Sequence, residues 1–163
     1  MSNKKISIST ISYKKKEDIR ILNACLSNWF HNPKILYFTS PNMTYPFNLK
    51  KWISLSYKEK NNKTIIVKID DWIIGHLSIK DKKKQGKAHL FHLIIDPNYH
   101  RKGFAKKLIL YAEELINNDN IKKITLNVAK KNQAARQLYY ALGYKDKETT
   151  RLGYIKMEKN LIN

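Results

Sequence analysis

Three β-rich runs follow one another between residues 64 and 95, and this succession constrains the fold more than any other feature of the chain. The first two runs are separated only by Asp70 and Asp71, which predicts a hairpin. A turn at Gly86 leads to the third run, residues 88–95, whose apolar side chains fall on both faces as in a central strand. We therefore expect an antiparallel meander of three strands.

The residues before the meander predict a strand, two helices and an irregular connection. Alternation over residues 6–13 indicates a strand, and helical spacing over residues 19–29 indicates a helix. Residues 31–46 carry three prolines among aromatic side chains, which predicts an irregular, partly buried connection. We interpret this connection as a candidate substrate wall, and we expect a further helix over residues 49–57.

The residues after the meander predict a helix and then another strand. After Gly103, apolar residues recur at intervals of three and four, which predicts a helix with one buried face. This helix is expected to end near Asn117 and Asn118. Residues 124–128 then alternate as a strand.

The last part of the chain predicts a second amphipathic helix over residues 135–142, stopped by Gly143, and a final hairpin through Gly153. The predicted class is therefore α/β (α+β), with a mixed, mostly antiparallel central sheet flanked by helices. A chain of 163 residues is long enough to enclose one hydrophobic core, so we expect a single domain over residues 1–163.

Composition narrows the functional classes. The single cysteine, Cys25, cannot form an internal disulfide, and residues 1–7 lack the apolar core of a signal peptide. No apolar run approaches the roughly eighteen residues that cross a bilayer. We expect a soluble, cytoplasmic protein, and we interpret Cys25 as a core side chain.

The formal net charge of +19 suggests an acidic partner, because a positive field concentrates phosphates, carboxylates and nucleic acid. Lysine supplies nearly all of this charge, and the chain is also rich in isoleucine and asparagine. The charge therefore fits a compositional habit of the source as well as it fits a binding site.

Residues 96–105 pass from the predicted central strand directly into an amphipathic helix. Such a junction presents unpaired backbone N–H groups and the positive end of a helix dipole, both of which favour a phosphate. Gly103 lets the backbone approach a ligand, and Arg101, Lys102 and Lys106 add positive charge. The segment is therefore a candidate diphosphate site.

Here the sequence resembles the GNAT superfamily of N-acetyltransferases, whose acetyl-CoA loop has the pattern Gln/Arg-x-x-Gly-x-Gly/Ala. The matching residues are His100, Arg101, Lys102, Gly103, Phe104 and Ala105. A second family signature, Asn-x-x-Ala-x-x-Leu-Tyr-x-x-x-Gly-Phe/Tyr, is matched by Asn132, Ala135, Leu138, Tyr139, Gly143 and Tyr144. The resemblance covers residues 64–154 and is weak over about the first sixty residues.

The resemblance implies direct attack of an amine on acetyl-CoA, the cosubstrate, in a ternary complex. It implies that the central strand opens beside the next strand, so that backbone groups of Leu93, Ile94 and Ile95 bind the pantetheine and polarise the thioester carbonyl. Further cofactor contacts are expected from every residue of the segment that begins at His100 and ends at Lys106, both included. His100 departs from the family pattern, which implies weaker cofactor binding through its backbone N–H alone.

The second signature implies two more site residues. Tyr139 stands where the family usually places the tyrosine that protonates the departing CoA and that also contacts the cofactor. The alternative is that Tyr139 belongs to an apolar helix stripe. Asn132 is expected to contact CoA, and a role as helix N-cap is equally consistent with its position. Tyr140, the next tyrosine, is expected to point elsewhere.

Two histidines are candidates for the catalytic base. Counting back from the loop places His89 where many relatives carry a glutamate, and imidazole titrates near pH 6.5. His92 is the second candidate. Either histidine is also consistent with a structural role, and an amine that arrives neutral needs no side-chain base.

The expected partners are acetyl-CoA or CoA and an amine acceptor, in a monomer or homodimer, with no metal, no membrane contact and no main role for nucleic acid. The acceptor stays open between a protein N-terminus or lysine and a small-molecule amine, and the positive net charge disfavours polyamines. Two alternatives remain. One is a basic RNA- or ribosome-binding module, suggested by the charge and the aromatic residues, and the other is an acetyl-CoA-binding protein without turnover.

Overall fold

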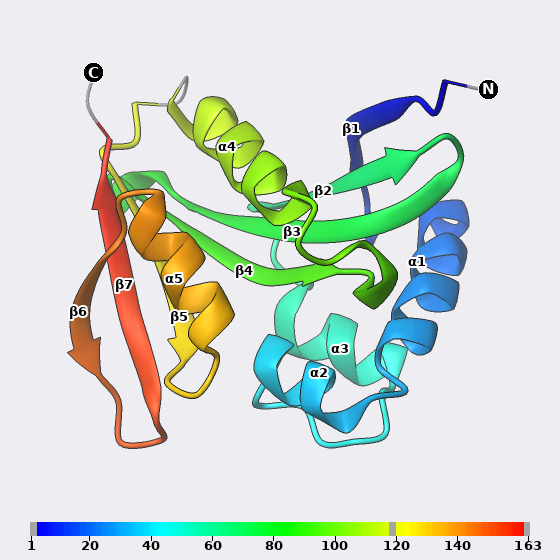
Figure 1. Ribbon diagram of the computed structural model, residues 1–163, viewed down its shortest axis with the longest axis horizontal. Coiled ribbons are helices and arrows are strands. Elements are labelled where there is room, and N and C mark those ends of the chain that lie inside the picture. Colours follow the sequence, from blue (N-terminus) through cyan, green and yellow to red (C-terminus); the bar gives the residue numbers. More distant parts are fainter. Residues whose placement is uncertain (1–2, 118–119, 162–163) are drawn as a thin grey trace.

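The computed structural model describes residues 3–117 and 120–161, which form one twisted sheet with helices on both faces (Figure 1). In spatial order the strands are β1, β2, β3, β4, β5, β7 and β6. The strands are β1 (Ile6–Ile11), β2 (Asn62–Ile69), β3 (Trp72–Lys82), β4 (Lys87–Ile95), β5 (Lys123–Ala129), β6 (Lys145–Thr149) and β7 (Tyr154–Asn160). The helices are α1 (Lys16–Trp29), α2 (Pro33–Thr39), α3 (Leu49–Ser56), α4 (Phe104–Asn117) and α5 (Gln133–Ala141).

The pairing of the strands confirms the predicted fold class. Five of the six neighbouring pairs of described strands are antiparallel, and only β4 and β5 run parallel. The three strands β2, β3 and β4 form the expected meander, and β6 and β7 form the expected final hairpin. The helix after Gly103 was expected to end near Asn117 and Asn118. It is α4, which extends to Asn117, and Asn118 lies outside the described residues.

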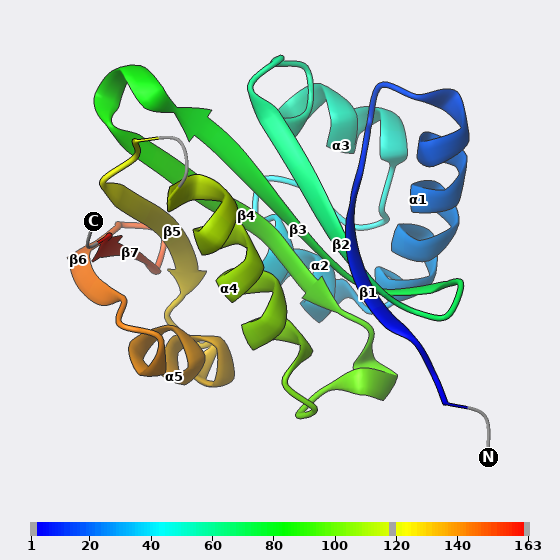
Figure 2. The same cartoon turned by 90° about the horizontal axis from the view of Figure 1, so that it is seen from above.

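Helices α4 and α5 cover one face of the sheet, and α1, α2 and α3 cover the other (Figure 2). On the first face Leu108, Ile109 and Ala112 of α4 are fully buried against the central strands. Close contact there depends on Gly75 of β3, since a Cβ atom at this position would lie 3.1 Å from a methyl group of Leu108 in α4 and 2.7 Å from side-chain atoms of the sheet. The small residue therefore sets how closely α4 approaches the sheet.

The second face has a core of its own, formed largely by aromatic side chains. Trp52 of α3 is 1% exposed and belongs to one cluster with Leu22 and Leu26 of α1 and with Phe30, which follows α1 directly. Burying such a set of side chains supplies most of the free energy that holds α1 and α3 on the sheet, at about 2 kcal/mol for each large side chain.

The expectation of an irregular connection over residues 31–46 is wrong for its first half, because Pro33–Thr39 forms the helix α2. Pro33 occupies the first turn, where no backbone donor is lost. The side chain of Asn32 caps the helix by accepting a hydrogen bond from the Lys34 N–H at 2.9 Å. The asparagine–proline pair is thus a helix start, with the proline in the one turn of a helix that tolerates it.

No helix within residues 3–117 and 120–161 is long and apolar enough to span a membrane.

Candidate active site

The strand β4 contains a bulge at its centre, and this bulge interrupts the regular pairing on one side. His92 has a φ of 55°, a left-handed conformation that is uncommon for a residue with a side chain. The register with β3 shifts between His76 and Ser78. On the other side, the parallel pairing with β5 ends at Leu90 and Leu126. Beyond Leu90 the two strands part, as the sequence resemblance implied.

A hollow lies where β4 and β5 part. Its walls include residues 90–93 of β4 and residues 126–128 of β5. Helix α5 contributes Tyr139, and Asn132 at its start also borders the hollow. Phe38 and Thr39, at the end of α2, border it as well. The hollow thus joins β4 and the second predicted motif, on α5, to the aromatic N-terminal segment.

Tyr139 is 8% exposed and borders this hollow. Its ring packs edge-on against Tyr144 with 5.9 Å between centroids, and among the described residues its hydroxyl has no hydrogen-bond partner. Burial raises the pKa of Tyr139 above the ordinary value, so the phenol keeps its proton at neutral pH. Tyr140 instead is 42% exposed and donates a hydrogen bond to Asp146, so the two tyrosines do have different surroundings.

The loop before α4 has the backbone of an anion-binding turn. Arg101 and Gly103 both have positive φ, at 62° and 84°. A Cβ atom at Gly103 would meet no other heavy atom within 4 Å, so the space in front of this residue is open to a ligand. The first backbone N–H groups of α4 lack partners within the helix and lie at its positive end. The residues present therefore fit a diphosphate.

The side chain of His100 holds the loop in place. Its Nε2 lies 2.8 Å from the carbonyl oxygen of Ile95 and donates to it, which fastens the loop to the end of β4. Its backbone N–H is directed at the carbonyl oxygen of Pro97 at 3.5 Å. The side chain thus shapes the loop, and the backbone donor that we assigned to the cofactor already has a neighbour.

Asn132 both caps a helix and borders the hollow. Its side-chain oxygen accepts a hydrogen bond from the backbone N–H of Ala135 at 3.3 Å. The N-cap alternative therefore holds in the structure. Since the same residue borders the hollow, the cap does not exclude a contact with a ligand there.

His89 does not border the hollow that Tyr139 borders. It lies in a second hollow with Thr125 of β5, and its Nδ1 is 2.8 Å from the Thr125 hydroxyl. The two hollows share Leu126 and Asn127 of β5, so they adjoin at the parting of the strands. Burial, with a smaller contribution from Lys82 and other nearby lysines, lowers the pKa of His89 to about 4.

His92 borders the same hollow as Tyr139, but its imidazole is part of the second core. It stacks on Trp52 with 3.9 Å between ring centroids, and its Nδ1 lies 2.7 Å from the hydroxyl of Tyr57. Burial lowers its pKa well below the ordinary value, and the charges of His76 and His89 add to this. The expectation that these imidazoles titrate near pH 6.5 is therefore wrong for both candidates, because burial disfavours the charged form.

Sequence reasoning missed a buried polar cluster behind the bulge. The Nδ1 atom of His76 lies 2.8 Å from the carbonyl oxygen of His92, and its Nε2 lies 2.8 Å from the hydroxyl of Tyr13. Trp52 donates from Nε1 to the same hydroxyl at 3.0 Å. The sequence signal for this cluster is a histidine within the apolar first half of β3.

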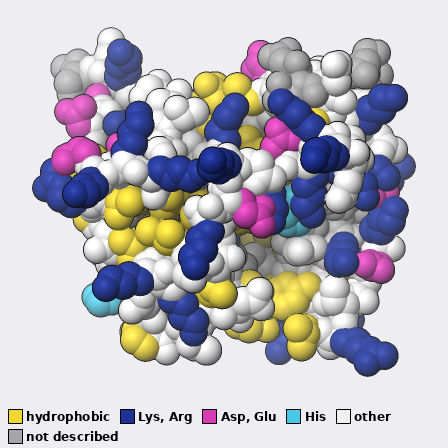
Figure 3. All heavy atoms as spheres, turned by 180° about the vertical axis from the view of Figure 1, so that it is seen from behind, with side chains coloured by type: hydrophobic (Ala, Val, Ile, Leu, Met, Phe, Trp, Pro, Cys, Tyr) yellow, Lys and Arg dark blue, Asp and Glu magenta, His cyan; other side chains and the backbone are white. Residues whose placement is uncertain are grey.

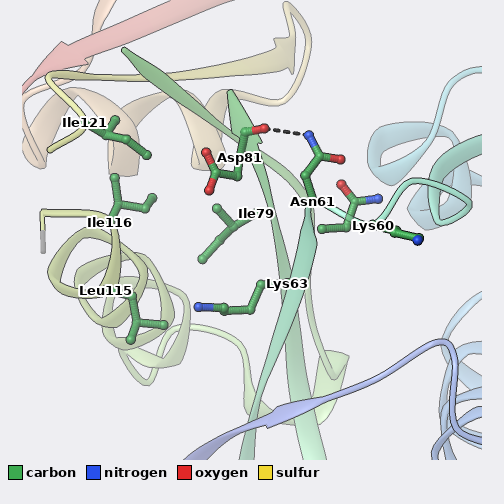
Figure 4. A pocket seen from close by; sticks show the side chains of 9 residues that line it. Lys60, Asn61, Lys63, Ile79, Asp81, Leu115, Ile116 and Ile121 are labelled. Atoms are coloured by element: carbon green, nitrogen blue, oxygen red, sulfur yellow. Dashed lines mark hydrogen bonds between the residues drawn. The ribbon is translucent and has the colours of Figure 1, made fainter. Parts of the chain in front are cut away.

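A further hollow lies apart from the place where β4 and β5 separate. A hollow lined by Leu115, Ile116 and Lys63 lies at the C-terminal end of α4, about 20 Å along the helix from the loop at its start (Figure 4). Lysine and arginine side chains are spread over the face shown in Figure 3, with acidic side chains among them. In the described ranges no three His, Cys, Asp or Glu side chains form a group that could hold a metal ion.

The open parallel pair, the positively charged loop at the start of α4 and the tyrosine on α5 are the features that the family resemblance led us to expect. The chain belongs to the acetyltransferase (GNAT) family, whose model matches residues 25–144. The sequence is 32% identical over 90 residues to spermidine N(1)-acetyltransferase of Thermoplasma acidophilum, a match that covers 55% of this chain and 54% of that protein. The match therefore spans about half the length of that relative.

Solved structures share the fold over nearly the whole chain. The PaiA N-acetyltransferase of Thermoplasma acidophilum, determined in complex with coenzyme A, has a TM-score of 0.72 at 22% identity, covering 96% of this chain and 99% of that one. The ribosomal-protein-S18-alanine N-acetyltransferase of Escherichia coli has a TM-score of 0.72 at 17% identity, covering 98% and 96%. At these identities the likeness shows the fold.

Proposed function

We propose that this protein transfers the acetyl group of acetyl-CoA to an amine, by direct attack in a ternary complex at the parting of β4 and β5. The observation that carries the proposal is the hollow that brings the β4 bulge, Asn132 and Tyr139 together. The cosubstrate supplies the acetyl group as an activated thioester. Family membership supports the same reaction.

The cofactor is expected to lie along one path from the loop to the bulge. Backbone N–H groups between Arg101 and Lys106, with the side chains of these two residues and Lys102, hold the diphosphate. Backbone groups of Leu93, Ile94 and Ile95 then pair with the pantetheine, because among the described strands the pairing of β4 on this side ends at Leu90. The Leu93 N–H points to the thioester oxygen and stabilises the negative charge that develops there.

Tyr139 serves as the general acid in this proposal. The amine nitrogen forms a bond to the carbonyl carbon, the carbon–sulfur bond breaks, and the phenol of Tyr139 gives its proton to the departing sulfur. The raised pKa of Tyr139 keeps the phenol protonated until the thiolate forms. Its hydroxyl has no competing hydrogen bond among the described residues.

His89 is the proposed base. With a pKa of about 4 it is unprotonated at neutral pH and weakly basic. It is therefore suited to take the proton of the amine nitrogen after the attack, when that proton has become more acidic. Its Nδ1 is held by Thr125, which leaves Nε2 for the acceptor side. His92 fits less well, since Tyr57 and Trp52 already hold its ring in the core.

The acceptor is proposed only as an amine. Glu148 and Glu158 border the hollow of His89, and both are ion-paired: Glu148 with Lys156 at 2.9 Å, and Glu158 with Lys147 at 3.4 Å. These carboxylates are therefore partly neutralised, which weakens the attraction for a polycation. A panel of spermidine, lysine and N-terminal peptides separates the two acceptor classes, small-molecule amines and protein amines.

The experiment that tests the proposal compares Tyr139→Phe with Tyr140→Phe. With an acceptor found in the panel, we expect Tyr139→Phe to lower kcat roughly 10²-fold or more, because the leaving thiolate loses its proton donor. Acetyl-CoA affinity should stay unchanged. Release of free CoA thiol gives the rate, and Tyr140→Phe should retain it. Equal rates in the two variants would remove Tyr139 from the mechanism.

A further inference from the structure

We propose that His76 is a positioning residue that aims the backbone N–H of Leu93 at the thioester carbonyl by holding the carbonyl oxygen of His92. The inference rests on the proposed function, in which that N–H is the donor that stabilises the transition state. His76 itself is 0% exposed, so it acts through the peptide between His92 and Leu93.

The hydrogen bonds around His76 fix which of its ring nitrogens carries the proton. The carbonyl oxygen of His92, 2.8 Å from Nδ1, only accepts hydrogen bonds, so Nδ1 must donate. Nε2 therefore accepts, and its partner at 2.8 Å, the hydroxyl of Tyr13, must donate. The Tyr13 oxygen in turn accepts from Nε1 of Trp52 at 3.0 Å. The cluster thus has one consistent set of donors and acceptors, and all of it ends on the His92 carbonyl.

Holding this carbonyl sets the direction of the next N–H. The peptide between His92 and Leu93 is trans, so its C=O and N–H point in opposite directions within one plane. His76 lies on β3 and holds the oxygen on the β3 side of the strand. The Leu93 N–H consequently points away from β3, toward the side on which pairing with β5 has ended. That side is the hollow bordered by Tyr139.

The conformation of His92 explains why such a hold is needed. Its φ of 55° lies in the left-handed region, which disfavours residues with a Cβ atom. The ordinary ladder with β3 is also broken at this point, since the register shifts between His76 and Ser78. At this break in the ladder, the side chain of His76 supplies a hydrogen-bond donor to the His92 carbonyl. Burial lowers the pKa of His76 to about 4, which keeps this single neutral form at neutral pH.

The test compares His76→Leu with His76→Asn. The two replacements have similar shape, but the asparagine amide places a donor near the position of Nδ1 and leucine has none. The readout is the infrared stretching frequency of the carbonyl in bound acetyl-CoA carrying ¹³C at that carbon. A donor that polarises the carbonyl lowers this frequency, whereas a change in stability alone does not move it.

We expect wild-type protein to lower the frequency relative to free acetyl-CoA, His76→Leu to lose most of this shift, and His76→Asn to recover part of it. In steady-state assays His76→Leu should lose roughly 10-fold or more in kcat, with little change in acetyl-CoA affinity, because a donor is misdirected and not removed. If His76→Leu fails to fold, His76→Met replaces it, since methionine also fills the space and also lacks a donor for the His92 carbonyl.

A full shift and full kcat in His76→Leu, or in His76→Met if it is used, would overturn the inference while leaving the proposed function intact. A wild-type protein that binds acetyl-CoA without any shift would overturn the role of the Leu93 N–H and the inference with it. Failure of wild-type protein to bind acetyl-CoA at all would instead contradict the proposed function itself.

Discussion

Burial changes the chemistry of the histidines near the site. His89 and His92 were both candidates for the base because free imidazole titrates near pH 6.5. In the fold, the pKa of His89 is lowered to about 4, and the pKa of His92 is lowered well below its usual range. At neutral pH both rings are uncharged. The base is therefore the neutral imidazole that faces the acceptor. His89 is the better candidate, because it lines a hollow together with Thr125.

His89→Asn separates catalysis from structure at this position. Asparagine keeps a group near Nδ1, which lies 2.8 Å from the Thr125 hydroxyl, and it lacks Nε2. We expect kcat to fall roughly 10²-fold, because the proton acceptor is lost, with acetyl-CoA affinity unchanged. The measurement is kcat from pH 6 to pH 9 with a saturating acceptor. A variant as active as wild type over this range would show that His89 is structural.

The site residues that could be predicted from the sequence are those that belong to motifs. The loop from His100 to Lys106 was predicted from its place before a helix and from the family resemblance, and Asn132 and Tyr139 from the resemblance alone; Asn132 and Tyr139 border the hollow, and the loop leads into α4. The roles of His76 and His92 could not be predicted, because they depend on a bulge. One extra residue reverses the side to which every following side chain points, and alternation along a strand does not reveal it.

Helices and strands with a clear periodicity in the sequence were predicted, whereas a short helix and the separation of two strands were not predicted from periodicity. The helix α4 and the strands of the meander follow from their own periodicity, and the structure confirms them. Helix α2 was missed although Asn32 and Pro33 form a standard start, because a seven-residue helix has too few turns to show a period. This miss matters for the site, since Phe38 and Thr39 at its end border the hollow. The parting of β4 and β5 was available only through the family resemblance.

The molecule as a whole combines buried neutral histidines with a formal net charge of +19. Lowered pKa values at His76 and His89 mean that the unfolded chain binds more protons than the folded one between about pH 6.5 and pH 4. The free energy of unfolding should therefore fall as the pH is lowered through this window. Above pH 6.5 these groups contribute their full stabilisation.

The size of this effect is a prediction for the whole fold. His76 alone should account for about 3 kcal/mol of the free energy of unfolding lost between pH 6.5 and pH 4. Urea unfolding at pH 7 and at pH 4.5 measures the loss in wild type, in His76→Asn and in His31→Gln, a control that removes an exposed histidine. His76→Asn should show a clearly smaller loss than the other two. The same pH dependence in all three proteins would show that the burial of His76 does not set it.

The most direct test of the account is calorimetric titration with acetyl-CoA, CoA and ATP, using wild type, Gly103→Glu and Gly86→Glu. Both glycines have positive φ and open space at the Cβ position, so the two variants carry the same charge and a similar backbone strain. We predict affinity on the order of micromolar for acetyl-CoA and CoA, much weaker binding of ATP, loss of binding in Gly103→Glu and retention in Gly86→Glu. Equal binding of all three ligands, or retained affinity in Gly103→Glu, would contradict the cofactor site and with it the proposed function.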